Sequence, residues 1–325
     1  MPTVSVVIPT FNRAHVVGQA IESVLAQTLT DFELILVDDG SSDNTAEIVK
    51  NFVDPRVRYV RQSNAGAGLA RNRGVDESSA DLAAFLDSDD LWMPQKLAAS
   101  VACAKAHPEV TAVFHDLEWQ HGDEVKPSLI RAFSPTMRRW LAAQNGSAEG
   151  VLTPREIYLM LLEEVPIKPT ALIVNKAAFQ NCGGFGPVAM AEDWEFLLRF
   201  CKRNEFAYVD QPLAVIRVSA ESIHVSHVAE NIADVYRMLE NEKILADPKD
   251  RGAFAAINRG IVSETREAHR RFLEQGRRWD AARLCLTGFS KTRSLELLMR
   301  AMAVFAPEPA LSLARASRRS IKADN

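Results

Sequence analysis

The chain contains a tight cluster of carboxylates that could bind a cation. Asp87, Asp89 and Asp90 fall within four residues, directly after the apolar run at 82–86. Carboxylates this close raise one another's pKa unless a cation or hydrogen-bond donors compensate. If a strand delivers them to the edge of a sheet, they could ligate a hard cation that prefers oxygen ligands. The alternative is a solvated turn, in which Asp is common.

Other polar residues also follow predicted strands. Four short apolar runs have the composition of buried strands: residues 4–8, 32–37, 57–60 and 82–86. Helical spacing of apolar residues between them gives the βαβ pattern of a parallel sheet, in which ligands bind outside the carboxyl ends of the strands. The polar residues at those ends are Asn12 and Arg13, Asp38 and Asp39, Asn64 and Gly66, and Asp87 and Asp89. We therefore expect them to converge on one crevice.

The second part of the chain is less regular. Expected strands lie at 112–119, 169–174 and 208–218, and expected helices at 153–162, at 175–180 and from 191. A capping box, Thr153 with Glu156, supports the first of these helices. Weak periodicity and several turn residues at 126–150 indicate a mobile loop or flap. From residue 228 onward the pattern is helical.

Composition and charge describe a globular protein. The 325 residues are 47% hydrophobic and 25% charged, and the net charge of −4 argues against a nucleic-acid partner. Residues 251–325 carry 15 Lys/Arg and 7 Asp/Glu, so an acidic body precedes a basic C-terminal region. The four cysteines show no metal-ligand spacing and are interpreted as reduced thiols. With neither a signal-peptide pattern nor a long apolar run, we expect a cytoplasmic protein.

The order of the motifs resembles that of family 2 glycosyltransferases, the large inverting group with a GT-A fold. The matching segments are 4–13, 27–28, 36–43, 64–66, 70–74, 86–90 and 192–194. The resemblance covers about residues 2–226. It implies an α/β fold with a Rossmann-like, mostly parallel central sheet flanked by helices. We expect a GT-A domain at 1–227, with a nucleotide-binding half (1–110) and an acceptor half (111–227), and a helical C-terminal extension at 228–325.

The resemblance also implies which residues bind the donor. They are Pro9, Thr10, Asn12, Arg13, Asp39, Asn64, Gly66, Arg71, Asp87 and Ser88. A carboxylate at Asp39 would accept a hydrogen bond from a uracil-type imide, although Asp is also a good helix cap. Arg71, near a helix N-terminus, would cradle a diphosphate, although it could be an ordinary exposed helix residue. The Gly66–Gly68 pair fails the dinucleotide fingerprint, because Arg71 occupies the position of its third glycine.

Metal-binding and catalytic roles follow from the same resemblance. One acid of the DxD motif, Asp87-Ser88-Asp89, should touch the ribose. Asp89, with Asp90 as a second candidate, should ligate Mg²⁺ or Mn²⁺, which neutralises charge on the departing nucleoside diphosphate. Which of the two lies closer to the ion stays open, and His224 is a further candidate ligand. Asp193 is the expected catalytic base, although an acid at a helix start can also serve only the helix dipole.

These residues together imply an inverting, metal-dependent glycosyltransferase. It would move a sugar from a nucleotide-sugar donor, expected to be a UDP-sugar, to a hydroxyl of a glycan, lipid-linked or protein acceptor, as in polysaccharide biosynthesis. The alternative is a non-catalytic nucleotide-sugar-binding or scaffold protein on the same fold. A sugar nucleotidyltransferase would need a glycine-rich, basic loop after the first strand, and residues 9–13 are not one.

The C-terminal region leaves two interpretations open. Its basic helical segments, with Arg270-Arg271 and Arg277-Arg278, and the apolar run at 295–305 could contact anionic lipids at the inner face of a membrane. They could instead pack on the domain or mediate self-association, which we favour.

Overall fold

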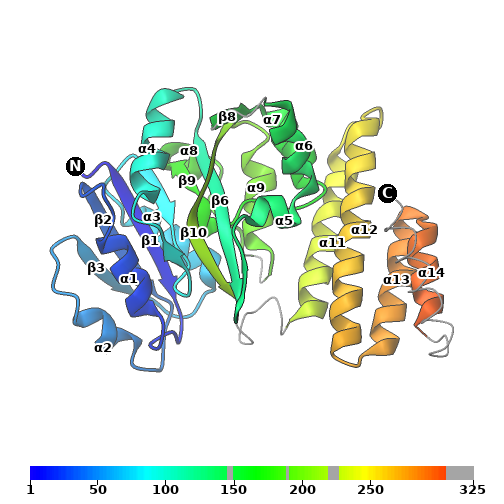
Figure 1. The fold of residues 1–325 in the computed structure, drawn as a ribbon, viewed down its shortest axis with the longest axis horizontal. Helices are drawn as coiled ribbons and strands as arrows, with labels where there is room; N and C mark the ends of the chain where they lie inside the picture. Colours follow the sequence, from blue (N-terminus) through cyan, green and yellow to red (C-terminus); the bar gives the residue numbers. More distant parts are fainter. Residues whose placement is uncertain (145–148, 188–189, 219–226, 305–325) are drawn as a thin grey trace. The chain divides into compact units, whose positions relative to one another are not determined.

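The computed structural model describes residues 1–144, 149–187, 190–218 and 227–304. The chain divides into two compact units, residues 1–220 and 221–325. The first unit is an α/β assembly around one sheet, and the described helices of the second lie side by side (Figure 1).

One sheet organises the first unit. Its strands are β1 (Val4–Thr10), β2 (Phe32–Asp38), β3 (Val57–Arg61), β4 (Leu82–Phe85), β5 (Leu91–Trp92), β6 (Ala112–His121), β7 (Glu124–Lys126), β8 (Glu149–Leu152), β9 (Ile173–Asn175) and β10 (Phe206–Val218). The order is β3-β2-β1-β4-β9-β6-β10-β5, with β7 on β6 and β8 on β10. The ladder β3-β2-β1-β4 and the β6–β10 pair are parallel, whereas β9, β5, β7 and β8 pair antiparallel. The predicted α/β fold with a mostly parallel sheet is confirmed.

Strand β1 is covered on both faces. All seven of its residues are buried, and successive side chains point to opposite sides of the sheet. Val6 belongs to the apolar cluster of α1 (Val17–Leu25), which also includes residues of α2 (Thr45–Lys50) and α4 (Lys96–Ala106). Val7 faces α3 (Ala67–Asp76), where an added Cβ on Gly74 would lie 2.3 Å from Val7 Cγ1. Coverage on both faces explains why this strand is largely apolar, with Val4, Val6, Val7 and Ile8 all buried.

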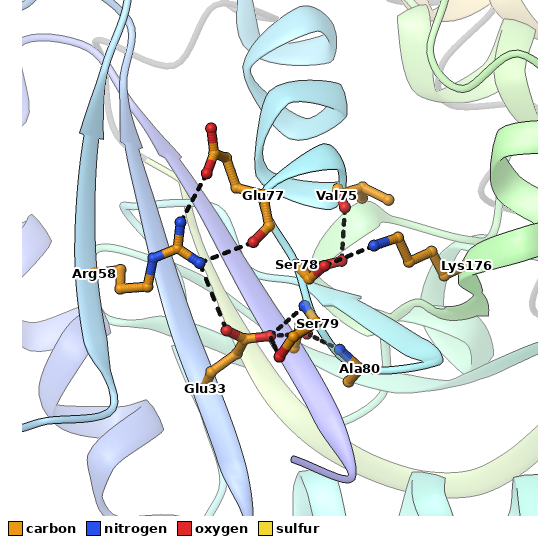
Figure 2. Close-up of polar contacts among 9 residues, drawn as sticks. Glu33, Arg58, Val75, Glu77, Ser78, Ser79, Ala80 and Lys176 are labelled. Carbon is orange, nitrogen blue, oxygen red and sulfur yellow. Dashed lines mark hydrogen bonds and ion pairs between the residues drawn. The ribbon is translucent and has the colours of Figure 1, made fainter. Parts of the chain in front are cut away.

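Polar contacts fasten the C-terminal end of α3 to the amino ends of the strands (Figure 2). Arg58 of β3 donates to the Glu77 carboxylate (2.7 Å) and to the Glu77 carbonyl (2.8 Å). Glu33 of β2 accepts from the Ser79 N–H (2.6 Å) and from the Ser5 hydroxyl (2.6 Å). Burial raises the pKa of Glu33, but these hydrogen bonds and the Arg58 charge outweigh it and lower the pKa from its ordinary value. The N-terminal half of α3 is thereby directed toward the carboxyl ends of the strands.

The prediction of a mobile loop or flap at 126–150 is wrong for the residues of this range that the structure describes. Two short helices lie there, α5 (Leu129–Phe133) and α6 (Pro135–Ala143), followed by β8. Ser128 and Ser134 cap them, each accepting from the backbone N–H three residues on, and Pro135 occupies the first turn of α6. Helices this short contain too few apolar positions to show a helical periodicity. The pair Ser134-Pro135, however, is typical of a helix N-terminus. Residues 145–148 lie outside the described part.

The other predicted elements of this unit are largely present. The described helices here are α7 (Pro154–Leu161), α8 (Lys176–Asn181) and α9 (Glu192–Phe200). The capping box of Thr153 and Glu156 forms at the start of α7. The strand expected at 169–174 begins later, because residues 169–171 form a 3-10 turn, η1 (Pro169–Ala171), that opens on a proline.

A row of aromatic rings supports α9. Its members are Phe85, Phe179, Phe185, Phe196, Phe200 and Phe206, from β4, α8, the loop before α9, α9 itself and β10. Neighbouring ring centroids lie 4.6–5.7 Å apart, the range in which aromatic pairs attract. Helix α9 is therefore anchored to the sheet along its apolar side.

The second unit is helical, as expected. Its described helices are α11 (Val228–Leu245), α12 (Arg251–Glu274), α13 (Arg278–Thr292) and α14 (Leu295–Ala303). Several of the basic residues noted above pair with acids of their own chain: Arg270 with Glu267 and Glu274, and Arg277 with Asp280. These pairs offset part of the positive charge on which the alternative of lipid contact depended. No described helix combines the length and the hydropathy that a membrane span requires.

Candidate active site

The candidate site lies where the sheet order reverses. The chain passes from β1 to β2 and β3 on one side, and then returns to β4 on the other side of β1. Residues after the carboxyl ends of β1 and β4 therefore meet at a topological switch point, the usual ligand position in such sheets. Arg13 Nε, after β1, lies 4.0 Å from Asp89 Oδ2, after β4. The predicted convergence of these two loops is confirmed.

Asn12 joins the loops that follow β1 and β2. Its backbone N–H donates to Ser41 Oγ (2.9 Å), and its side-chain oxygen accepts from the Ser42 N–H (2.8 Å). Its φ of 52° lies in the left-handed region, which Asn tolerates better than most residues. The sequence prediction placed Asn12 at a bound base, and the structure gives it a loop-fixing role.

Asp39 holds the loop that leads into α3. Its carboxylate accepts from the Ala65 N–H (2.9 Å), the Gly66 N–H (2.8 Å) and Gln62 Nε2 (2.8 Å). The capping alternative does not describe it, because the N-cap residue of α2 is Asn44. A carboxylate has about four acceptor positions, so one stays available for a ligand N–H.

The remaining predicted donor-binding residues lie around the same edge. Pro9 and Thr10 end β1 and are buried, and among the described residues Thr10 Oγ1 has no hydrogen-bond partner. Ser88 is buried between the acids of the cluster, and Asn64 is exposed in the loop before α3. A buried, unpaired hydroxyl at the end of β1 is an acceptor or donor that a ligand could satisfy.

Arg71 is a buried bridge between two carboxylates. Its side chain is 4% exposed, and it donates to Asp87 Oδ1 (2.6 Å) and to Glu192 Oε1 (2.9 Å). Burial alone would lower the pKa of Arg71, but the two negative charges outweigh it and raise the pKa. The alternative of an exposed helix arginine is therefore wrong. Both terminal nitrogens of the guanidinium are held by protein carboxylates in this structure, and the diphosphate-binding role of Arg71 stays a prediction.

Glu192 is a site residue that the sequence prediction missed. Burial raises its pKa; Arg71 opposes this rise, and the charge of Asp193 adds to it. An added Cβ on Gly68 of α3 would lie 3.1 Å from Glu192 Cγ, so a glycine lets the two helix starts approach closely. Nothing local in the sequence pairs Arg71 with an acid 121 positions away.

Asn72 makes the second connection from α3 to the start of α9. Its side-chain amide donates to the Phe185 carbonyl (2.9 Å) and accepts from the Phe185 N–H (2.9 Å). Adjacent residues of α3, Arg71 and Asn72, thus hold both the loop before α9 and its first residue.

Asp193 lies in the first turn of α9. Its carboxylate accepts from the Trp194 N–H (2.8 Å), and no ion pair engages it among the residues that the structure describes. Trp194 itself is buried, with its indole N–H donating to the Leu161 carbonyl (2.6 Å), so it belongs to the core. Asp193 is therefore the carboxylate of this turn that is available to accept a proton.

Asp89 and Asp90 differ in their surroundings. Asp90 is 5% exposed and accepts from Thr170 Oγ1 (2.5 Å) and from the Arg217 N–H (3.2 Å). The Asp89 side chain is 37% exposed and lies 4.0 Å from Arg13 Nε, and its backbone carbonyl accepts from Arg217 Nε (2.6 Å). Burial and the Asp87 charge raise the pKa of both carboxyls. Asp89 is the better candidate ligand, because Asp90 already has protein donors.

The cluster fits a divalent cation that shares its ligands with a substrate. Asp87 and Asp89 have partly exposed carboxylates whose mutual repulsion a cation would relieve. Among the described residues these acids do not form a closed set of three ligand atoms. Such an arrangement suits Mg²⁺ or Mn²⁺, which take one or two carboxylates together with substrate phosphates. His224 lies outside the described residues.

The chain is similar to known glycosyltransferases in sequence. Residues 5–149 match the family described as glycosyl transferase family 2. An uncharacterised glycosyltransferase of Rickettsia bellii is 30% identical over 67% of this chain. The Escherichia coli enzyme WfgD, a UDP-Glc:α-D-GlcNAc-diphosphoundecaprenol β-1,3-glucosyltransferase, is 41% identical over 30% of this chain. The chain spans only 29% and 40% of the lengths of these two relatives.

Solved structures share the fold. TarS of Staphylococcus aureus, residues 1–349 in complex with UDP-GlcNAc, has a TM-score of 0.61 at 19% identity, covering 93% of this chain and 79% of that one. The mannosyltransferase PcManGT of Pyrobaculum calidifontis, in complex with GDP-Man and Mn²⁺, has a TM-score of 0.56 at 17% identity, covering 98% and 81%. Residues 5–149 therefore form a region of glycosyltransferase family 2, and the chain shares the fold of these solved structures.

Proposed function

We propose that this protein is an inverting glycosyltransferase that transfers a sugar from a UDP-sugar to a hydroxyl group. The observation that carries the proposal is the Arg71 bridge. It joins Asp87 of the cation-type cluster to Glu192, and the candidate base Asp193 follows Glu192 in the chain. A protein that only binds a nucleotide-sugar would not need the Asp193 carboxylate, which no ion pair engages among the described residues.

The donor would lie over the carboxyl ends of β1, β2 and β4. Asp39 retains an acceptor position for the imide N–H of a uracil, and Thr10 offers a buried hydroxyl. Asp87 and Ser88 would lie near the ribose. The relatives support a nucleotide-sugar of this type, since the names of WfgD and of the TarS complex contain UDP-Glc and UDP-GlcNAc.

Asp193 would act as the base. As the acceptor oxygen attacks the anomeric carbon, its proton passes to the Asp193 carboxylate, and the bond from that carbon to the diphosphate oxygen breaks on the opposite side. One displacement inverts the configuration. Glu192 is less suited to this role because Arg71 already holds its carboxylate.

A divalent cation would be held by Asp89, with Asp90 beside it, and when bound it would supply positive charge to the leaving diphosphate. Mg²⁺ or Mn²⁺ suits these oxygen ligands, and the PcManGT complex contains Mn²⁺. Arg13 adds positive charge on the same side, 4.0 Å from Asp89. The acceptor we propose is a glycan or a lipid-linked sugar, by analogy with the WfgD name. Cytoplasmic location, membrane contact and self-association stay predictions.

The test is a screen of UDP-Glc, UDP-GlcNAc, UDP-Gal and GDP-Man with Mn²⁺, Mg²⁺ or EDTA, scored by release of nucleoside diphosphate. We expect turnover with one UDP-sugar, lost in EDTA. Asp193→Asn should lower turnover about 10²–10⁴-fold while donor binding persists. Glu195→Gln is the matched control, because Glu195 lies in the same turn but pairs with Arg199. Equal turnover in both variants would remove Asp193 as the base, and activity undiminished by EDTA would remove the metal.

A further inference from the structure

Three side chains of metal-ligand type meet at a second place in the first unit. Cys103 and His107 come from α4 and the residue that follows it, and Glu149 is the first residue of β8. One ligand atom from each, a sulfur, a ring nitrogen and a carboxylate oxygen, lie within 4.8 Å of one another. His107 Nε2 is 3.9 Å from Glu149 Oε2.

The local fold explains how these residues meet. Cys103 and His107 are four positions apart, which places them on the same side of α4. Cys103 is fully buried against apolar residues of β6 and β10, so its sulfur is fixed in place. Strand β8 pairs antiparallel with β10, with Glu149 opposite Val209, and this pairing brings Glu149 to the end of α4. The spacing around the cysteines did not suggest a metal because the third ligand lies far along the chain.

A second glutamate orients the histidine. His107 Nδ1 lies 3.3 Å from Glu109 Oε1, within hydrogen-bond distance. Metal-binding histidines commonly donate their other ring N–H to a carboxylate, which fixes the tautomer. With its proton on Nδ1, the ring presents the Nε2 lone pair toward the Glu149 carboxylate. Two acceptors that face each other are stabilised by a cation between them.

We propose that Cys103, His107 and Glu149 bind one Zn²⁺ ion, with Glu109 as the outer carboxylate that orients His107. Sulfur, imidazole nitrogen and carboxylate oxygen are the donors that Zn²⁺ takes in proteins. The side chains of His107 and Glu149 are 29% and 42% exposed, which leaves room for water as a fourth ligand.

The position indicates a structural role. Helix α4 follows β4 and β5 and runs back to the start of β6, so its C-terminal end lies at the edge of the sheet away from Asp87 and Asp89. The ion would join α4 to β8, an edge strand that follows α5 and α6. It would therefore fasten the segment between β7 and β8 without touching the nucleotide-sugar site.

Zinc and cobalt titrations of the full-length protein, after chelator treatment and dialysis, test the proposal. We expect about one equivalent of Zn²⁺ to bind and to raise the melting temperature. Co²⁺ should give the near-ultraviolet absorption of a thiolate–cobalt bond. Cys103→Ser should remove that absorption, and Cys182→Ser, a free cysteine elsewhere in this unit, should keep it.

Surface variants keep the test independent of core folding. Glu149→Gln should weaken Zn²⁺ binding at least tenfold, and Glu109→Gln about 10–100-fold, as expected for an outer carboxylate. The exposed His121→Gln and the active-site variant Asp89→Asn should leave it unchanged. Absence of binding would overturn the proposal in favour of a protonated His107 between two glutamates. Binding that survives Cys103→Ser and Glu149→Gln would place the ion elsewhere.

Discussion

Replacing Arg71 with methionine removes the cation between Asp87 and Glu192 and leaves two carboxylates facing an apolar side chain. Breaking a buried ion pair from one side costs about 3–5 kcal/mol. The partners are 31% and 19% exposed, so water would solvate them in part, and we discount the cost to about 2–3 kcal/mol. For a unit of this size that corresponds to a melting temperature lower by roughly 5–10 °C.

Tryptophan fluorescence in urea can follow the first unit alone. Four of the five tryptophans lie in that unit, and a Trp279→Phe background removes the signal of the second. The matched control is Arg73→Met on the same helix, because Arg73 is 52% exposed and pairs with Glu77 at the surface. It should cost less than about 1 kcal/mol. If the Arg71 and Arg73 variants lose equal stability, the bridge does not support the fold as described.

A double-mutant cycle measures the interaction free energy between Arg71 and Glu192. Glu192→Gln removes the charge that Arg71→Met leaves unpaired, so the double variant should lose less free energy of unfolding than the sum of the single variants. A coupling of about 1–3 kcal/mol is expected for residues in direct contact. Strict additivity would show that Glu192 is not an energetic partner of Arg71.

Three further outcomes are expected. Asp89→Asn should lower sugar transfer about 10²–10³-fold, whereas the exposed Asp123→Asn should not; equal activities would argue against the cation assignment. The lowered pKa of Glu33 means that its ionised form stabilises the fold above about pH 4.5, and that this contribution disappears as the pH falls through the lower folded-state pKa. Glu33→Gln should therefore cost about 1–2 kcal/mol at pH 7 and progressively less in acid, in urea unfolding at several pH values, and a pH-independent difference would contradict this. Gly74→Ala would place a Cβ 2.3 Å from Val7 Cγ1 and should cost about 1–3 kcal/mol in the same assay. Val7→Ala should restore part of that loss, and an unchanged stability of the Gly74 variant would refute the close contact.

The β1–β4 part of the sheet was predictable because its signals are local. The buried strands β1, β2 and β4 are largely apolar, and the polar residues that follow them reach one edge by the rules of parallel sheets. Arg13 and Asp89 could therefore be placed together from their positions alone, and the structure separates their charged atoms by 4.0 Å.

Pairings over long separations were not predictable. Asp90 looks like an equal of Asp89 in the sequence, yet Thr170 and Arg217 hold its carboxylate, from segments 80 and 127 positions away. The partners of Arg71 were hidden for the same reason. The helices at 129–143 were missed because the sequence indicates them by their capping residues and not by apolar periodicity.

The strand order limits how this protein can be divided. The family match ends at residue 149, but β9 lies between β4 and β6, and β10 continues the sheet beyond β6. A chain cut at that residue would leave β4 and β6 with open edges, whose unpaired N–H and C=O groups favour aggregation. It would also lack Asp193 and Arg217. Fusions, domain swaps or shortened forms should therefore keep residues 1–218 together as the smallest piece with a closed sheet interior and every described site residue.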